Sequence, residues 1–191
     1  MKSVILFGGN GYLGTNFVKE WLAHGPADVH FFVLGRSLQS KKISTHQTNI
    51  QVDVTNEQAV LAVLPEQIDY IIDFVGAPSK APQSFAKLNY EPASVMKKIA
   101  EQKNVRAMGF IGGVLGPKRF TKSKKQIIDD LKTSFIPLAY VEPTLVYGAG
   151  RQDAMTRNVP MLKILGLFSK RLKPVRVEDV VNNLRTNLLQ Y

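Results

Sequence analysis

The sequence predicts an α/β fold in which a doubly wound parallel sheet forms a single domain. Short continuous apolar runs recur along the chain, as in strands buried on both faces of a parallel sheet. Segments with helical spacing of apolar residues separate these runs. With 191 residues the chain can form one full core but hardly two. We therefore expect one domain over 1–191, in which 149–174 form a small lid insertion near the C-terminal end.

The first apolar run and the segment after it predict a strand, a glycine loop and a helix. Val4–Phe7 is the strand, Gly8, Gly11 and Gly14 follow at a spacing of three, and 15–23 has helical periodicity. In dinucleotide sites such glycines permit a tight turn, the approach of a pyrophosphate and close packing of helix on sheet. The helix N-terminus then faces the phosphates. The alternative interpretation is an ordinary strand-to-helix turn.

The second predicted strand, 29–34, bears on the choice of cofactor. Dinucleotide folds that prefer NAD place an acidic residue after this strand, where it binds the ribose 2′-OH. Here Arg36 occupies that region, and a guanidinium suits a phosphate rather than a diol. We therefore predict NADP rather than NAD, with Ser37, Lys41 or Lys42 as further contacts. The alternative is a surface arginine at a strand end.

The later segments continue the alternation of strands and helices. A third strand is expected at 50–55, where Asp53 could reach an adenine amine, and a helix at 56–64. The fourth strand, 70–75, contains Asp73, which is either a site carboxylate or a hydrogen-bonded structural residue. The remaining expected elements are a helix at 85–102, a strand at 105–111, a helix at 120–131 and a strand at 136–141.

Composition narrows the classes of function. The chain has no cysteine, and its three histidines are not spaced as metal ligands, so we expect no metal site. The formal net charge of +10 comes from scattered lysines and arginines without a nucleic-acid-binding module, so we expect no nucleic acid partner. No apolar run has the length of a membrane span, and the first strand starts without room for a signal peptide. These features favour a cytoplasmic protein.

Several motifs in order make the chain resemble the short-chain dehydrogenase/reductase superfamily, in particular its extended and atypical branches with NAD-dependent epimerase/dehydratase-like proteins. The matching segments are the glycine loop, Asp53-Val54, Gly76-Ala77, Asn89, the segment Glu142–Gly148, similar to R-P-x-x-V-Y-G, and 174–180, similar to V-x-D-V. The resemblance implies an NAD(P)-binding Rossmann fold. It implies cofactor contacts from Gly8, Asn10, Gly11, Tyr12, Leu13, Gly14, Arg36, Asp53, Val54, Val75, Gly76, Ala77, Lys124, Pro143, Thr144 and Val146.

The expected catalytic residues depart from the family pattern. The family uses a Tyr-x-x-x-Lys pair on one helix face, together with a hydroxyl residue from the fifth strand. Phe120 stands in the tyrosine position here, Lys124 is retained, and the strand ends in Gly112-Gly113 without a hydroxyl. We expect Lys124 to hold the nicotinamide ribose, while the proton donor is unassigned.

Three functional hypotheses follow from this departure. The first is an NADP-dependent oxidoreductase of a small or apolar molecule, with a hydroxyl supplied by Tyr147, Ser123 or Thr121, or with hydride transfer alone to a flavin or quinone. The second is a noncatalytic NADP-binding sensor or accessory protein. The third is a peripheral membrane protein of lipid or quinone metabolism, which would use the basic amphipathic segment 159–173.

Overall fold

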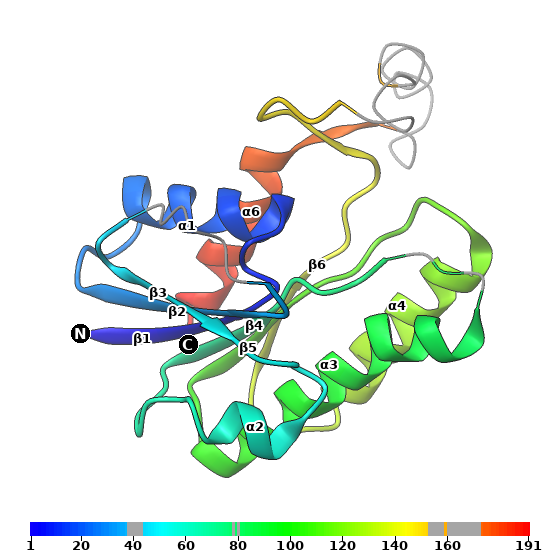
Figure 1. Cartoon of the computed structure of the whole chain (residues 1–191). Helices are drawn as coiled ribbons and strands as arrows, with labels where there is room; N and C mark the ends of the chain where they lie inside the picture. Colours follow the sequence, from blue (N-terminus) through cyan, green and yellow to red (C-terminus); the bar gives the residue numbers. More distant parts are fainter. Residues whose placement is uncertain (38–43, 78, 80, 153–158, 160–172) are drawn as a thin grey trace.

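A central sheet of six parallel strands organises the protein. The computed structural model describes residues 1–37, 44–77, 79, 81–152, 159 and 173–191. The strands are β1 Lys2–Phe7, β2 Val29–Gly35, β3 Gln47–Gln51, β4 Tyr70–Asp73, β5 Ala107–Ile111 and β6 Leu138–Val141. They lie in the order β3-β2-β1-β4-β5-β6 (Figure 1). The order reverses between β1 and β4, and in doubly wound sheets ligands bind at the carboxyl ends of the strands at this reversal.

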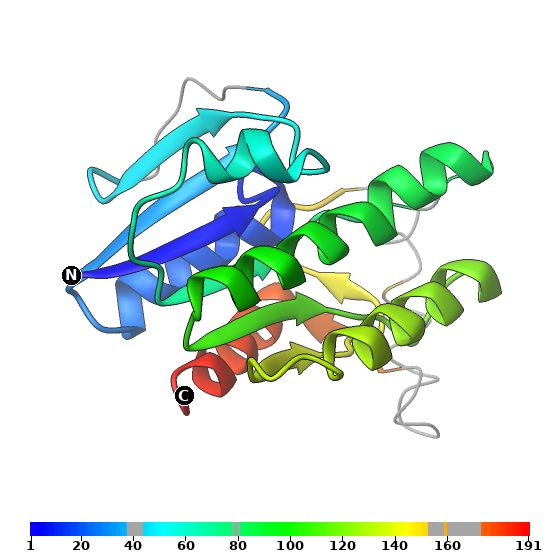
Figure 2. The same cartoon turned by 90° about the horizontal axis from the view of Figure 1, so that it is seen from below.

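Helices cover both faces of the sheet, as the sequence predicts. The helices α1 Tyr12–His24 and α6 Val177–Leu188 lie on one face. The other face carries α2 Glu57–Leu61, α3 Pro82–Lys103 and α4 Lys118–Leu131, which stand in front of the sheet in Figure 2. Each face has its own apolar core. The protein is therefore a three-layered doubly wound α/β domain.

Neighbouring strands in the centre of the sheet are almost wholly apolar. Ile5 of β1 lies opposite Phe32 of β2 and Ile71 of β4. Ile5 and Ile71 are fully buried, because helices cover both faces of these strands. This is the physical reason why the continuous apolar runs in the sequence predict the central strands.

The boundaries of the third strand differ from the sequence prediction. The strand is Gln47–Gln51 rather than 50–55, and it pairs with β2 so that Gln51 lies opposite Gly35. It forms an edge of the sheet, where a polar strand is tolerated and gives little apolar signal. Asp53 and Val54 consequently lie in the loop after the strand. The helix that follows is also shorter than expected, ending at Leu61.

A small second sheet joins the two ends of the expected lid. It pairs β7 Val146–Tyr147 in parallel with β8 Val175–Arg176. The Thr144 hydroxyl donates a hydrogen bond to the carbonyl of Lys173 beside it. Of the lid expected at 149–174, residues 153–158 and 160–172 lie outside the described residues, as does most of the amphipathic segment 159–173. Within the described part of the chain, no helix has both the length and the apolar character to span a membrane.

Candidate functional site

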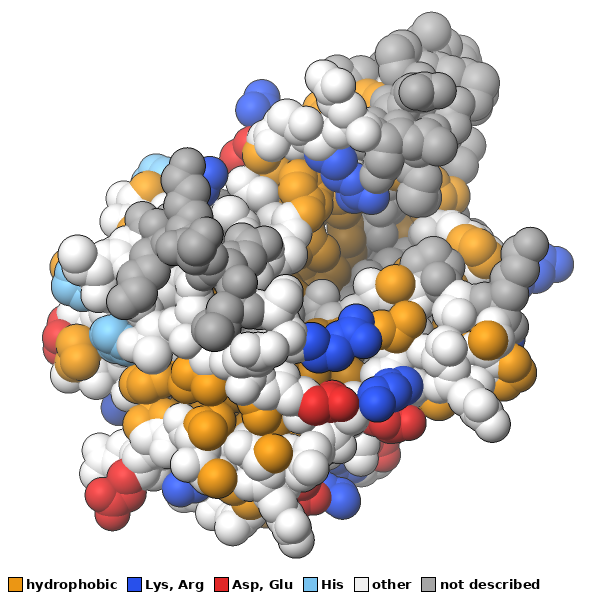
Figure 3. Space-filling view, viewed as in Figure 1, with side chains coloured by type: hydrophobic (Ala, Val, Ile, Leu, Met, Phe, Trp, Pro, Cys, Tyr) orange, Lys and Arg blue, Asp and Glu red, His pale blue; other side chains and the backbone are white. Residues whose placement is uncertain are grey.

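Two adjacent cavities open at the carboxyl ends of the strands. The first has a volume of about 340 Å³ and the second of about 230 Å³, and Val75 lines both. Figure 3 shows this side of the molecule hollowed, with hydrophobic side chains at the bottom of the hollow and Lys or Arg side chains at its rim. The shared Val75 places the two cavities side by side along the topological switch point of the sheet.

The glycine loop connects β1 to α1 and borders the first cavity. Gly8 has a φ of +69°, in the left-handed region that favours glycine. Its carbonyl accepts a hydrogen bond from the Gly11 amide at 2.9 Å. A Cβ on Gly14 would lie only 2.4 Å from the Cα of Gly9, so no side chain fits between the helix and the loop. The loop thus brings the N-terminus of α1 close to the cavity.

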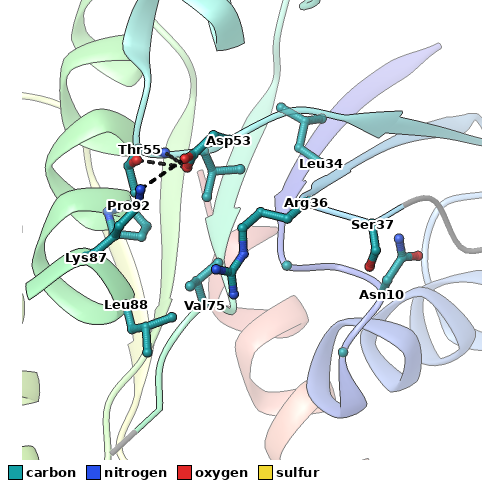
Figure 4. Close-up of a pocket in the computed structure, with 14 residues that line it drawn as sticks. Asn10, Leu34, Arg36, Ser37, Asp53, Thr55, Val75, Lys87, Leu88 and Pro92 are labelled. Atoms are coloured by element: carbon teal, nitrogen blue, oxygen red, sulfur yellow. Dashed lines mark hydrogen bonds and ion pairs between the residues drawn. The ribbon is translucent and has the colours of Figure 1, made fainter. Parts of the chain in front are cut away.

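The first cavity lies between the end of β2, the loop after β3 and helix α3. Figure 4 shows Arg36 extending from the end of β2 into this cavity, while Ser37 points toward Asn10 of the glycine loop. Across from Arg36, the carboxylate of Asp53 forms an ion pair with Lys87 of α3, with 3.4 Å between Oδ2 and Nζ. Two cationic side chains therefore reach the same cavity from opposite walls.

Asp53 is tied to its own loop. Its Oδ1 accepts hydrogen bonds from the Thr55 hydroxyl at 2.8 Å and from the Thr55 amide at 3.1 Å. The Thr55 hydroxyl, its amide and the nearby Lys87 ammonium hold the pKa of Asp53 below its ordinary value. The carboxylate is therefore ionised at neutral pH, and its position is fixed.

The structure brings most of the predicted cofactor residues to the two cavities. The first cavity is lined by Gly8, Asn10, Gly11, Arg36, Asp53, Val54 and Val75. The second is lined by Leu13, Val75, Gly76, Lys124, Pro143, Thr144 and Val146.

Three predicted residues line neither cavity. Tyr12 instead donates a hydrogen bond from its hydroxyl to the Gly148 carbonyl at 3.0 Å. Gly14 packs against the loop, and the carbonyl of Ala77 accepts a hydrogen bond from Asn89 at 3.0 Å. These residues support the walls of the site from behind.

Two charged residues of the site were not predicted from the sequence, Lys87 of the first cavity and Arg151 of the second. The second cavity contains Arg151, whose guanidinium lies 5.1 Å from the centre of the Tyr12 ring. Lys87 lies on the exposed side of a helix, where lysines are common, and no local pattern separates it from the others. Only the placement of α3 against the loop after β3 distinguishes Lys87.

Lys124 and Phe120 lie on the same face of α4 in the second cavity, as their four-residue spacing predicts. The Lys124 Nζ is 5.6 Å from the centre of the Phe120 ring and 4.5 Å from that of Phe110. Its side chain is nearly fully buried, with an exposed fraction of 5%. The Nζ donates a long hydrogen bond of 3.4 Å to the Val75 carbonyl. The cavity thus contains an ammonium group where the family has a tyrosine–lysine pair.

Asp73, at the end of β4, is the second buried ionisable group of this cavity. Its exposed fraction is 1%, and its Oδ1 accepts a hydrogen bond from the Val75 amide at 2.7 Å. Its Oδ2 is buried and has no hydrogen-bond partner among the residues that the structure describes. Burial raises the pKa of Asp73 to about 7 against the opposing charge of Lys124, and burial lowers the pKa of Lys124.

The hydroxyl groups considered as replacements for tyrosine are directed elsewhere. The Ser123 side chain is buried and donates to the Phe120 carbonyl at 2.7 Å. The Thr121 hydroxyl donates to the Lys118 carbonyl at 3.2 Å. Ser123, Thr121 and Tyr147 are not among the described residues that line the second cavity.

The sequence over residues 4–114 matches the model of the NAD dependent epimerase/dehydratase family. The chain belongs to this family. The matched segment runs from β1 through β5 and contains the glycine loop, Arg36 and Asp53. It ends before α4, so Phe120 and Lys124 lie outside it. Membership confirms the resemblance to the extended short-chain dehydrogenases/reductases. No curated protein matches the sequence.

Solved structures share the whole fold at low sequence identity. A UDP-glucose 4-epimerase superposes with a TM-score of 0.74 and 16% identity over 99% of this chain and 73% of its own. The Bordetella bronchiseptica enzyme WbmF in complex with NAD+ gives a TM-score of 0.69 and 20% identity over 96% and 68%. A GalE-like L-threonine dehydrogenase from Cupriavidus necator gives 0.70 and 13% over 94% and 70%. These similarities confirm the doubly wound Rossmann fold.

Proposed function

We propose that this protein binds NADP(H) across the two cavities and acts as an oxidoreductase on a small or apolar molecule in the second. The observation that carries the proposal is the pair of adjacent cavities along the switch point of the sheet, with residues of the glycine loop and the start of α1 lining both. WbmG and WbmF, which share the fold, were solved in complex with NAD or NAD+. A nicotinamide dinucleotide is therefore the ligand class that the family and the site both support.

The glycine loop and the shape of the first cavity fit the adenosine half of a dinucleotide. The close approach of Gly14 to Gly9 leaves space at the N-terminus of α1, where backbone amides and the helix dipole favour a pyrophosphate. Asp53 and Val54 would then contact the adenine, because they form the far wall of the same cavity. The carboxylate of Asp53 is an acceptor that suits an amino group.

The preference for NADP rests on the charges around the first cavity. No acidic residue follows β2 in Gly35-Arg36-Ser37, and Arg36 reaches into the cavity. Lys87 adds a second cation from the opposite wall. A 2′-phosphate placed between them would gain charge-assisted hydrogen bonds that the diol of NAD does not provide.

In the second cavity, Lys124 would hold the nicotinamide ribose. Its ammonium lies against the Gly76 backbone, since a Cβ on that residue would come within 2.6 Å of Nζ. The bound cofactor supplies or accepts the hydride. Apolar side chains of Leu115, Phe120 and Leu145 surround the remaining space and would exclude water from a small apolar substrate.

Cofactor binding is tested by isothermal titration of the wild type with NADPH and NADH, repeated with Arg36→Ala. We expect the wild type to bind NADPH more tightly, and the substitution to weaken NADPH by about 10–100-fold, because a charge-assisted pair contributes about 1.5–3 kcal/mol. NADH affinity should change little. Arg106→Ala is the matched control, since this exposed arginine pairs with Asp69 at 2.8 Å and lines neither cavity. Equal affinity of the wild type for both cofactors contradicts the NADP assignment.

A noncatalytic NADP-binding sensor or accessory protein is the second candidate function. It is favoured by Phe120 in the tyrosine position and by the absence of a hydroxyl at Gly112-Gly113. Spectrophotometric NADPH consumption with carbonyl, quinone and flavin acceptors separates the two candidates. Turnover supports the oxidoreductase, whereas tight NADPH binding without consumption of any acceptor supports the sensor.

A further inference from the structure

The second cavity offers few groups that can exchange a proton. Among the described residues that line it, Asp73, Lys124, Thr144 and Arg151 have exchangeable side-chain protons. Arginine guanidinium groups are not deprotonated in proteins, so an arginine does not supply the proton. The Thr144 hydroxyl already donates to the Lys173 carbonyl. Proton exchange near neutral pH is therefore left to Asp73 and Lys124.

The surroundings of Lys124 leave its ammonium free to serve a ligand. The structure gives Nζ one hydrogen bond, the 3.4 Å contact to the Val75 carbonyl. An ammonium has three N–H groups, and the other nearby surfaces are the rings of Phe110 and Phe120. Phe120 occupies the tyrosine position one helical turn away, and the Lys124 Nζ lies 5.6 Å from the centre of its ring.

Asp73 and Lys124 line the same cavity, and both side chains are buried. In the sheet its two neighbours are Phe7 of β1 and Phe110 of β5, and both are fully buried. Lys124 from α4 and Arg151 after β7 are the charged side chains of its cavity among the described residues. Within the described part of the chain, the buried Oδ2 of Asp73 has no hydrogen-bond partner. Lys124 and Asp73 therefore interact in a low-dielectric site, where charge interactions are strong.

We propose that Lys124 is the proton donor of the second cavity and that Asp73 is the positioning residue that sets when Lys124 releases its proton. This inference rests on the proposed oxidoreductase function. In reduction of a carbonyl or quinone, the acceptor takes a hydride from the reduced nicotinamide cofactor. A Nζ–H bond of Lys124 breaks and an O–H bond forms at the substrate oxygen. The neutral amine then regains a proton from solvent, so one hydride and one proton enter the product.

The electrostatics of the pair support this role. Burial lowers the pKa of Lys124, which makes its ammonium a better acid, and the Asp73 carboxylate opposes this shift. Asp73 thereby keeps Lys124 protonated over a wider pH range than burial alone would allow. Removal of the carboxylate should shift the titration of Lys124 to lower pH.

The first test is a titration of the cofactor-free protein by NMR, with 13C at the ε-carbon of lysine and Lys124→Met to assign the signal. We expect Lys124 to titrate below the ordinary lysine pKa of about 10.4. Asp73→Asn should lower its midpoint by about one pH unit or more. Asp129→Asn, at an exposed position of α4, is the matched control and should leave the midpoint unchanged. A midpoint near 10.4, or a midpoint that is the same in the wild type and in Asp73→Asn, overturns the proposal.

The second test is the pH profile of NADPH oxidation with a quinone or carbonyl acceptor. The basic limb should follow the Lys124 midpoint and move to lower pH in Asp73→Asn by the same amount. Lys124→Arg retains the positive charge but cannot release a proton, so turnover should fall by roughly 100-fold or more while NADPH affinity stays within a few-fold. Lys125→Arg, which alters an exposed lysine beside it, is the control.

The outcomes separate the inference from the function on which it rests. Turnover whose pH profile is the same in Asp73→Asn and wild type contradicts the inference alone. Undiminished turnover in Lys124→Arg likewise contradicts the proton-donor role of Lys124 and leaves the oxidoreductase function standing. If none of the acceptors makes the wild type consume NADPH, the proposed oxidoreductase function fails. The proton-donor role then fails with it, even where the NMR titration shows the Asp73–Lys124 coupling.

Discussion

The two cavities of the site are built in opposite ways. The first is bordered by exposed polar side chains, among them Arg36 and Lys87, and the carboxylate of Asp53 in its wall is ionised and hydrogen-bonded. The second is largely apolar and buries Asp73 and Lys124, whose charged forms are disfavoured by burial. The first cavity also lies within the matched family segment, whereas α4 of the second lies beyond it.

This difference shows how one scaffold separates ligand binding from chemistry. A cavity open to water can attract a phosphate with ordinary charges, because solvent already keeps arginine, lysine and aspartate ionised. A buried cavity changes the proton affinity of its groups, so a few side chains there decide what reaction is feasible. Substitutions in the two cavities should consequently have different pH signatures.

The largest expected effect concerns the stability of the protein at different pH values. Asp73 keeps its proton up to a pKa of about 7 in the folded protein, whereas the unfolded chain loses it near 3.8. Asp73 should therefore contribute stability that is fully present below about pH 4 and is lost as the pH rises to about 7, by up to about 4 kcal/mol. Urea unfolding at a series of pH values measures this. Asp73→Asn should flatten the decline, and an unchanged slope would show that Asp73 titrates normally.

The next effect concerns the glycine loop of the first cavity. Gly14→Ala places a Cβ 2.4 Å from the Cα of Gly9 and must push α1 away from the loop. We expect a loss of about 1–3 kcal/mol in stability and of most NADPH affinity. Thermal unfolding with and without NADPH measures both. Gly35→Ala is the control for stability, because its Cβ would meet no protein atom within 4 Å, and equal losses of stability in the two variants would contradict the packing argument.

A smaller effect is expected at Lys87. Lys87→Ala removes the second cation of the first cavity and should weaken NADPH by about 3–10-fold with little change for NADH, since this side chain is half exposed and screened. Isothermal titration at low and high salt measures this change. Lys98→Ala on the same helix, which pairs with Glu57, should have no effect. A similar loss for both cofactors would show that Lys87 does not read the 2′-phosphate.

The smallest structural change tests the departure in the second cavity. Phe120→Tyr adds one hydroxyl at the tyrosine position. The centre of the Phe120 ring lies 5.6 Å from the Lys124 Nζ. The substitution should change the free energy of unfolding by less than about 1 kcal/mol. We expect carbonyl reduction to rise, and to depend less on Asp73 than in the wild type. NADPH consumption by Phe120→Tyr with and without Asp73→Asn measures this. If Asp73→Asn lowers NADPH consumption by the same factor in Phe120→Tyr as in the wild type, the expected smaller dependence on Asp73 is contradicted.

Local sequence patterns predicted the fold and much of the candidate site. The central strands are apolar on both faces, so Val4–Phe7 and its neighbours give a clear signal. The edge strand Gln47–Gln51 gives a weak one, because its polar side chains face solvent, and it was predicted three residues too late. Lys87 was missed because nothing local distinguishes a helical lysine at a cavity from one in solvent.

By itself, the sequence determined the alternation of strands and helices, the glycine loop, the position of Arg36 and the Phe120–Lys124 spacing. Each of these depends on residues close together in the chain, and their spacing encodes their geometry. Only the tertiary structure decided that Lys87 faces Arg36 and that Asp73 shares a cavity with Lys124. These pairs come from different strands and helices, and their burial, which sets their proton affinities, exists only after the layers have packed.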